Sequence, residues 1–380
     1  MLLSASPTAY LDDLLDRVGL KLQLSPTAYD LAVERYRAIA EWLRAEGSPL
    51  AGYDFDIYAQ GSLRIGTTVK LRGRQEFDLD FVCEFRVDPS VFPDPIKLLD
   101  MIEERLRAHG TYRHMVERKN RCIRVTYANE FYMDILPACP SPSVCLYGEY
   151  CVVVPDCDAD DWKPSNPKGY ALWYEGRARE AIAEFRKSVE PLPEQQAYED
   201  LATLNRVVQL IKRQRDIFFE NAPKGRAPIS VVLTTLAARN YTGRKSVSEA
   251  MGLVLDGIVR MIPDVARGRL KVTNPTNPEE DFSERWDSDP EAYLAFVSWV
   301  RGFRVKWEEL MQQRGIHNVK AALEKMFGER VAKEAVEEHV KAYEEPRQSG
   351  RLGVGRGTGM IVSASSSATA IPRNTFYGGE

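Results

Sequence analysis

Two periodicities of apolar and polar residues divide the chain into a mixed first half and a helical second half. Segments 53–59, 77–85 and 122–136 alternate apolar and polar residues, which is typical of half-buried strands, and the last holds two such runs around an Ala-Asn-Glu turn. Segments 26–46 and 95–108 carry apolar residues at helical spacing instead. These elements predict helices packed on one strongly twisted mixed sheet.

From about residue 192 onward, apolar residues recur only at helical spacing. The first of these segments has an apolar stripe made of Leu201, Leu204, Val208, Ile211 and Phe218. The later helical segments are 228–240, 247–262, 289–312 and 317–342, interrupted by the Pro- and Asn-rich stretch 273–281. The sequence therefore predicts an α+β protein with a mixed domain at 1–190, which includes a long N-terminal helix, and a helical lobe at 191–345. Residues 346–380 are rich in Gly, Ser and Arg and are expected to form a flexible tail.

The composition is that of an ordinary globular protein, because 44% of the 380 residues are hydrophobic and 28% are charged. A net charge of −4 gives no general field that would hold a long nucleic acid, so double-stranded DNA is not expected as an activator, although a local basic groove is compatible with this charge. The chain has no signal-peptide pattern at its start and no run of 18 apolar residues. We expect a cytoplasmic protein without a membrane partner.

Six cysteines in a chain of this length, without a secretory signal, are expected to be reduced thiols. Cys139, Cys145, Cys151 and Cys157 recur every six residues, so turns between them could bring four sulfurs together around zinc. Paired Cys-x-x-Cys motifs are absent, however, and buried thiols in short strands explain the same residues. The sequence leaves both explanations open.

The candidate chemistry lies on the alternating strands, where acidic residues occupy positions that share a face. Asp78 and Asp80 are two positions apart on one predicted strand, so their side chains point to the same side, and Asp134 ends a later strand. Three convergent carboxylates repel each other unless a cation is present. Two Mg²⁺ ions, for which Mn²⁺ can substitute, would satisfy them. Asp78, Asp80 and Asp134 are therefore the predicted catalytic and metal-binding residues.

Gly61 and Ser62 close the strand that precedes these acids. Their backbone amides and the Ser62 hydroxyl are suited to the β- and γ-phosphates of a nucleotide, because glycine permits close approach. An Asp-x-Asp pair or a Gly-Ser turn alone is common, and an exposed edge strand or a plain loop usually explains either one. Their order along the chain, followed by a third Asp on another strand, predicts nucleotidyl transfer to a ribose hydroxyl.

A second polar cluster lies opposite the apolar stripe of the first helix of the helical lobe. Asn205, Gln209, Lys212 and Asp216 recur at spacings of four, three and four residues, so they share one helix face. A solvated face would explain this pattern, but Lys212 could also reach a triphosphate across the cleft. Ser230 begins the next helical segment, where it could act either as a helix cap or as an anion-binding residue.

Several motifs of the chain together resemble the bacterial CD-NTases, relatives of cyclic GMP-AMP synthase and oligoadenylate synthase. The matching stretches lie within residues 25–340, and their combination is far more specific than any one of them. They are Gln60–Thr68, Phe77–Asp80, Asp134–Ala138, Ile211–Asp216, Ile229–Leu236 and Asn274–Phe282.

The resemblance implies a polymerase-β-like nucleotidyltransferase core, with the helical lobe closing the active-site cleft. It implies Mg²⁺, ATP and other nucleoside triphosphates as substrates, and a cyclic di- or trinucleotide that activates an effector in anti-phage defence (CBASS). By motif position, Asp78 and Asp80 would bind the metals and Asp134 would act near the attacking hydroxyl, while the phosphates would be held by Ser62, Lys212 and Ser230. No base-reading residue follows from it; Asn166, Tyr170 and Trp173 are candidates for which packing or loop structure is an equal explanation.

The resemblance also implies a regulatory partner, either a ubiquitin-transfer-like protein or a HORMA-type protein. The end of the chain, Asn374–Glu380, is similar to termini through which some family members are conjugated, but Glu380 departs from a free-glycine end. An ordinary disordered tail is the alternative. Two rival functions stay open as well: a template-independent transferase that modifies RNA ends, tRNA or a protein, and a catalytically dead nucleotide-binding partner, which the intact triad disfavours.

Overall fold

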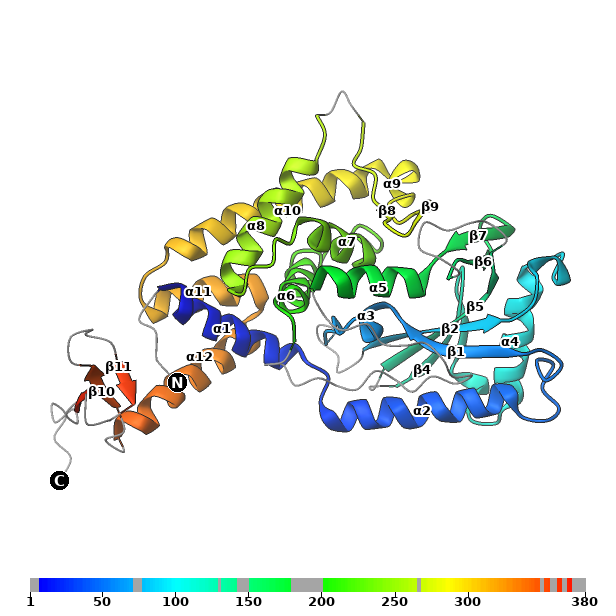
Figure 1. Ribbon diagram of the computed structural model, residues 1–380, viewed down its shortest axis with the longest axis horizontal. Coiled ribbons are helices and arrows are strands. Elements are labelled where there is room, and N and C mark those ends of the chain that lie inside the picture. The colour runs from blue at the N-terminus through cyan, green and yellow to red at the C-terminus, as the bar shows by residue number, and fades with distance from the viewer. Residues whose placement is uncertain are drawn as a thin grey trace.

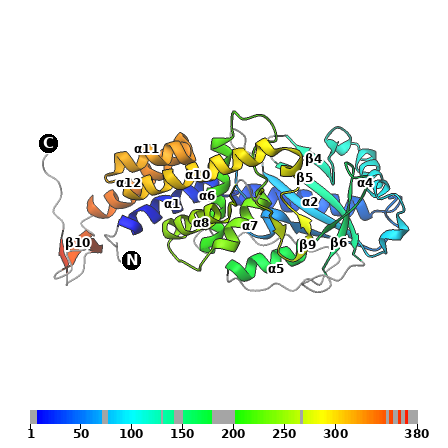
Figure 2. The ribbon, with the colours of Figure 1, turned by 90° about the horizontal axis from the view of Figure 1, so that it is seen from above.

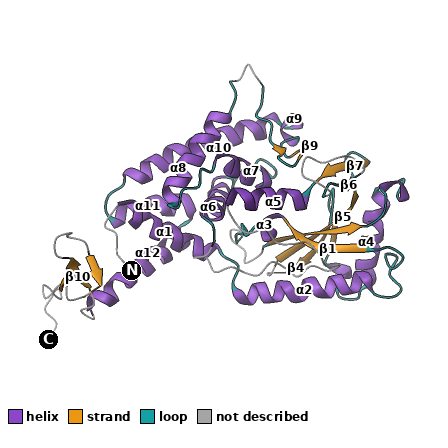
Figure 3. Cartoon of the chain, viewed as in Figure 1, coloured by secondary structure: helices purple, strands orange, loops and turns teal. Residues whose placement is uncertain are grey.

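The computed structural model describes residues 7–70, 77–128, 131–141, 150–178, 201–264 and 268–348, together with strand residues 352–355, 361–363 and 368–370. Figure 1 shows an elongated molecule with a sheet at one end, a bundle of helices in the middle and a small separate sheet beside the C-terminus. Figure 3 shows helices and strands in largely separate parts of the molecule, so the predicted α+β class is confirmed.

The main sheet has seven strands among the described residues, in the order β1-β2-β5-β4-β3, with β6 pairing β5 and β7. Strands β2 and β5 are parallel, whereas β1 is antiparallel to β2 and β4 is antiparallel to β5. The strands are β1 (Phe55–Gln60), β2 (Asp78–Phe85), β3 (Val116–Arg118), β4 (Ile123–Tyr127), β5 (Phe131–Pro140), β6 (Val152–Asp156) and β7 (Asp161–Ser165).

Alternation along the strands gives the sheet one apolar face and one face that carries the acids. Leu79, Phe81 and Cys83 of β2 are buried in a core shared with two helices, α2 (Pro26–Arg44) and α4 (Ile96–Ala108). Figure 1 shows α2 lying along this side of the sheet. The side chains of Asp78 and Asp80 point away from α2 and α4, toward the helical lobe, because successive side chains of a strand alternate between its two faces.

The remaining helices form the helical lobe and its connections to the sheet. They are α1 (Pro7–Leu22), α3 (Gly61–Arg64), α5 (Pro167–Ala178), α6 (Thr203–Phe218), α7 (Ser230–Asn240), α8 (Val247–Met261), α9 (Arg285–Ser288), α10 (Pro290–Gln312), α11 (Ile316–Phe327) and α12 (Glu329–Gln348). Two short 3₁₀ helices (Pro89–Val91 and Tyr112–His114) flank α4, and strands β8 (Thr273–Asn274) and β9 (Asn277–Asp281) form a hairpin.

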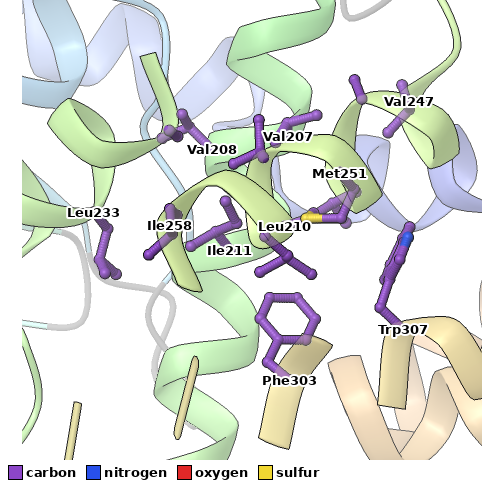
Figure 4. Packing of buried hydrophobic residues seen from close by; sticks show 14 of the residues in the cluster. Val207, Val208, Leu210, Ile211, Leu233, Val247, Met251, Ile258, Phe303 and Trp307 are labelled. Atoms are coloured by element: carbon purple, nitrogen blue, oxygen red, sulfur yellow. The ribbon is translucent and has the colours of Figure 1, made fainter. Parts of the chain in front are cut away.

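Helix α6 is the centre of the helical core. Figure 4 shows Leu210 and Ile211 of α6 among side chains from neighbouring helices, including Met251 of α8 and Phe303 of α10. Each of these four side chains is at most 1% exposed. The apolar stripe predicted from the sequence thus holds the lobe together, except that Phe218 at its end is 44% exposed.

Helix α1 was not foreseen from the sequence, which placed the first helix at 26–46. It packs against α8 and α12, so the start of the chain lies beside its last long helix, as Figure 2 shows. The contact includes an ion pair between Lys21 and Glu338, and His339 Nδ1 lies 2.5 Å from Asp13 Oδ2. Such a pairing between distant segments leaves no trace in local periodicity.

The helices predicted after residue 228 are present in the structure, except that one predicted helix is divided into two. The segment 317–342 is two helices, because Gly328 between them has φ of +98° and ends α11. Within the predicted tail, α12 continues to Gln348, and three short strands pair in the order β11-β10-β12. This regular structure differs from the irregular segment that the sequence predicted. These are β10 (Leu352–Gly355), β11 (Ile361–Ser363) and β12 (Ala368–Ala370). Asn374–Glu380 and the predicted boundary at residue 190 lie outside the described residues.

The prediction that the cysteines are reduced thiols holds for only some of them. Cys83, Cys122, Cys139 and Cys157 are free thiols, but Cys151 is disulfide-bonded, so the expectation of reduced thiols is wrong for Cys151. Cys145 lies outside the described residues, and among those described no group of three His, Cys, Asp or Glu is arranged to hold a metal. No helix in the described part of the chain is long and apolar enough to cross a membrane.

Candidate active site

The register of the main sheet places the acidic residues in one row across neighbouring strands. Asp80 of β2 is paired with Asp134 of β5, and Asp134 is paired in turn with Arg124 of β4. Asp78 lies two positions before Asp80 and shares its face. The structure therefore brings the three predicted carboxylates together on the face that meets the helical lobe.

Gly61 lies directly against this row. Its φ is +60°, and a Cβ at this position would lie 2.4 Å from Oδ2 of Asp80. Only glycine fits, both for its backbone conformation and for the space left by the carboxylate. Gly61 begins α3, and the nearest neighbour of a Cβ there is Asp80, while the close approach of Gly61 and Ser62 to phosphates stays a prediction.

The carboxylates destabilise each other's charge. Burial, followed by the charges of Asp134 and Asp78, raises the pKa of Asp80 to about 7. Burial also raises the pKa of Asp78, and Asp134 adds to this shift, although Arg124 opposes it. A raised carboxyl pKa means that the ionised form lacks enough positive charge nearby, which a bound cation would supply.

Arg124 is the positive side chain closest to these acids. Its Nε and Nη2 donate to the two oxygens of Asp134, each at 2.7 Å, and its Nη2 lies 3.6 Å from Asp78 Oδ1. The hydrogen bonds and charge of Asp134 raise the pKa of this guanidinium. Arg124 therefore offsets part of the negative charge of Asp134 and Asp78.

Side chains on the polar face of α6 form hydrogen bonds to the loop that follows Ser62. Asn205 Nδ2 donates to the carbonyl of Ile65 at 2.9 Å, and Gln209 Nε2 donates to that of Thr68 at 3.2 Å. Lys212 Nζ donates to the carbonyl and the Oγ1 of Thr67, at 3.0 and 3.1 Å. These three α6 side chains are only 1–3% exposed. The face is therefore a contact between the two lobes, and the explanation as a solvated face is wrong for them.

Lys212 also faces the cavity between the lobes. Burial, with Arg215 next in effect, lowers the pKa of Lys212 to about 7. Its two hydrogen bonds to Thr67 use two of the three donors of an ammonium group. Lys212 therefore has a donor and a poorly solvated charge to offer an anion.

Ser230 is the first residue of α7, and Ile229 occupies the cap position, so Ser230 is not a helix cap. Its Oγ accepts a hydrogen bond from Arg215 Nη1 at 3.0 Å. Ser62 is held in a similar way, since Thr68 Oγ1 donates to Ser62 Oγ at 3.3 Å. Because each serine oxygen accepts a bond, its own hydroxyl hydrogen is free to donate into the cavity.

These groups line one cavity of about 250 Å³ between the sheet and the helical lobe. Asp78, Asp80, Asp134 and Arg124 form what we call its acidic wall. Lys212, Arg215 and Ser230 form its basic wall, and the Gly61-Ser62 turn lies at the cavity as well. All seven predicted site residues border this cavity, which has acceptors on one side and cations and hydroxyls on the other.

Comparison with known proteins places this chain in a family. The model of the Second Messenger Oligonucleotide or Dinucleotide Synthetase domain matches residues 7–177. A solved structure of the CD-NTase CdnG of Bradyrhizobium diazoefficiens in complex with GTP has a TM-score of 0.71 at 28% identity, covering 88% of this chain and 99% of that one. A c-di-GMP synthase of Roseivirga ehrenbergii is 32% identical over the whole of both chains. This chain is a CD-NTase.

The predicted resemblance is thereby confirmed. The Bradyrhizobium diazoefficiens cyclic dinucleotide synthase CdnG is also similar in sequence, at 30% identity over 93% of this chain and 89% of that one. This CD-NTase is accordingly a nucleotidyltransferase that synthesises cyclic oligonucleotides.

Three residues weighed as base readers have packing roles in the CD-NTase structure. Asn166 is fully buried, and its Oδ1 accepts from the amide of Gly169 at the start of α5. Tyr170 borders the cavity, but its hydroxyl is bonded to Thr235, and Trp173 packs against the helical core. These contacts support the structural explanation for Asn166 and Trp173, and leave Tyr170 as a cavity side chain.

Sequence reasoning missed two arginines of the CD-NTase cavity. Arg215 lies three residues after Lys212, a helical spacing that could have placed it on the same face. Arg124 alternates with apolar residues on β4 and could have been assigned to the acidic face once the strand was recognised. Its pairing with Asp134 depends on strand register, for which the sequence carries no direct signal.

Proposed function

We propose that this CD-NTase joins ribonucleoside triphosphates, GTP among them, into a cyclic dinucleotide by two-metal nucleotidyl transfer, as a signal in anti-phage defence. The observation that carries the proposal is the cavity with opposed walls. A nucleoside triphosphate with its divalent cations complements both walls at once, because the cations match the carboxylates and the phosphates match the lysine, arginine and serine donors.

The residues present fit divalent metal ions. Asp78, Asp80 and Asp134 offer only oxygen ligands, which Mg²⁺ and Mn²⁺ prefer, and burial and the neighbouring acids raise the pKa of Asp80, an effect that a bound cation would oppose. Asp78 and Asp80 would hold the ions, with Asp134 contributing from β5. Bound there, Mg²⁺ would lower the pKa of an attacking hydroxyl and offset the charge of the leaving pyrophosphate.

The basic wall accounts for the phosphates. Ser62 and Ser230 would each donate a hydroxyl hydrogen to a phosphate oxygen, while Lys212 would supply a charged donor from α6. In the reaction, a ribose hydroxyl near Asp134 forms a new bond to the α-phosphorus of the donor, and the bond to pyrophosphate breaks. A second transfer of the same kind closes the ring and releases a second pyrophosphate.

The relatives support the choice of a dinucleotide and of GTP. One full-length relative is named a c-di-GMP synthase, and CdnG has been solved with GTP. For the biological setting, we propose that the product acts on a downstream effector and that a regulatory protein controls the enzyme. A HORMA protein accompanies the structurally similar CdnC, while conjugation through Asn374–Glu380 is the alternative route.

The test is incubation of the purified chain with all four ribonucleoside triphosphates and Mg²⁺, followed by phosphatase treatment and mass spectrometry. A phosphatase-resistant cyclic dinucleotide is expected, and it should disappear when GTP is omitted. A product that persists without GTP would reject the base assignment. Transfer of a nucleotide only to added RNA or protein would reject cyclisation as the function of this chain.

A further inference from the structure

The side chain of Arg124 is fixed by several contacts at once. Besides its two hydrogen bonds to Asp134, its guanidinium carbon lies 4.8 Å from the ring centroid of Tyr132, two residues before Asp134 on β5. Arg124 and Asp134 are direct cross-strand partners, and the Arg124 side chain is 24% exposed. Neighbours on the adjacent strand therefore fix both the face and the end of this side chain.

The planar guanidinium restricts the carboxylate it binds. A two-bond fork sets both the position of the Asp134 carboxylate and the plane in which it lies, which a single point charge would not do. Each carboxylate oxygen keeps a further lone pair while it accepts one hydrogen bond. Asp134 can thus remain bound to Arg124 while its oxygens face a cation or a hydroxyl.

On this basis we propose that Arg124 is a positioning residue for the reaction: it orients Asp134 for the metal ions and the attacking hydroxyl. The inference rests on the proposed two-metal function, because Asp134 needs an orientation only if it serves such a site. Residues that hydrogen-bond the ligands of a metal commonly change its affinity by about 10–100-fold when they are replaced.

A competing role for Arg124 predicts the opposite change in metal affinity when this residue is removed. Nη2 of Arg124 lies 3.6 Å from Asp78 as well, so the guanidinium could instead be a plug that occupies the place of a cation. Removing a plug would strengthen metal binding, because a positive charge is lost from the acidic wall. Removing an orienting residue would weaken metal binding. Metal affinity therefore separates the two roles.

The experiment measures Mn²⁺ binding to the full chain by electron paramagnetic resonance, for wild type, Arg124→Gln and Arg124→Lys. We expect Arg124→Gln to weaken Mn²⁺ binding by about 10-fold or more. Arg124→Lys keeps the charge but loses the fork, so it should recover only part of the affinity. Unchanged or tighter binding in Arg124→Gln would overturn the proposal.

Arg118→Gln is the matched control. Arg118 lies on the neighbouring strand β3, is 30% exposed, and its Nη2 pairs with Asp100 and Glu103, each at 2.6 Å. It does not border the cavity. Its replacement removes a comparable ion pair, so the thermal midpoint should change about as much as in Arg124→Gln. A loss of Mn²⁺ binding in Arg118→Gln equal to that in Arg124→Gln would show a general effect on folding and would overturn the positioning role.

A second readout separates this inference from the proposed function. GTP affinity, measured by calorimetry without divalent cations, should stay within about twofold in Arg124→Gln, because the phosphates bind the basic wall, while kcat with Mg²⁺ falls about 10–100-fold. An equal rise in the dissociation constant of GTP would overturn orientation through Asp134. If wild type binds Mn²⁺ in an Arg124-dependent way but makes no cyclic product, the positioning role stands and the proposed function fails.

Discussion

The two walls of the cavity are built by different means. The acidic wall is built by strand register, which places Asp80, Asp134 and Arg124 side by side on three neighbouring strands. The basic wall is built by helix period, which brings Lys212 and Arg215 to one face of α6. In the acidic wall, burial and the neighbouring acids raise the pKa of Asp80 to about 7, and in the basic wall, burial and Arg215 lower the pKa of Lys212 to about 7.

This difference shows that each wall lacks what one part of the substrate supplies. The two walls partly compensate each other, since Lys212 lowers the pKa of Asp80 and Asp80 raises the pKa of Lys212, but burial outweighs both effects. Divalent cations would relieve the first wall and phosphates the second. A metal-bound triphosphate, as we propose, would therefore relieve both walls, which cost some stability in its absence.

The largest effect is expected when the acidic wall loses its charge. The double substitution Asp78→Asn and Asp80→Asn keeps the side-chain volumes and removes the metal ligands, so product formation should fall by at least about 1,000-fold. Mass spectrometry of the product and circular dichroism of the fold would be measured together. Residual wild-type turnover in a folded variant would contradict the metal assignment.

A single position tests how closely the start of α3 approaches the acidic wall. Gly61→Ala adds a Cβ that would lie 2.4 Å from Asp80 Oδ2 and forces an alanine into φ of +60°, so we expect turnover to fall about 100-fold and unfolding free energy to fall by about 1–3 kcal/mol. Gly302→Ala is the control, because a Cβ there meets nothing within 4 Å. Chemical denaturation and initial rates would be compared, and normal turnover in Gly61→Ala would reject the close approach.

Loss of a charge from the basic wall should affect activity and stability in opposite directions, because the buried charge lowers the stability of the fold but helps to bind the substrate. Lys212→Met removes a buried ammonium, so kcat/KM should fall about 10–100-fold while thermal stability stays the same or rises. Kinetics with GTP and differential scanning calorimetry would be measured on the same preparation. A large fall in the thermal midpoint would indicate that the hydrogen bonds to Thr67 are the main role of Lys212.

The smallest effect concerns a contact away from both walls. His339 and Arg17 lower the pKa of Asp13 to about 2, against the effect of burial. A lowered carboxyl pKa adds stability above about pH 4, and this stability is lost as pH falls toward 2. Because the side chain is 36% exposed, we expect Asp13→Asn to lose no more than about 1 kcal/mol at pH 7, with a smaller loss at pH 3. Urea unfolding at both pH values would measure this, and an equal loss at both would contradict it.

Much of the site could be predicted from the sequence because its signals are local. Asp78 and Asp80 share a face by strand alternation, and Lys212 shares a helix face with Asn205 and Gln209. Ser62 and Gly61 were recognisable from their position between a strand and the acids. By contrast, local periodicity could not tell whether the polar face of α6 meets solvent or the loop of Thr67, since both give the same pattern along the helix.

The sequence by itself determined the α+β class, strands β1, β2, β4 and β5 and helices α2, α4, α7, α8 and α10 to within a few residues, and seven of the residues that border the cavity. Only the tertiary structure decided that Arg124 pairs with Asp134, that α1 packs on α12 and that α6 grips the loop after Ser62. The physical reason is range. Periodicity and turn geometry are set by neighbours along the chain, whereas strand register and contacts between lobes depend on the packing of segments that lie far apart in sequence.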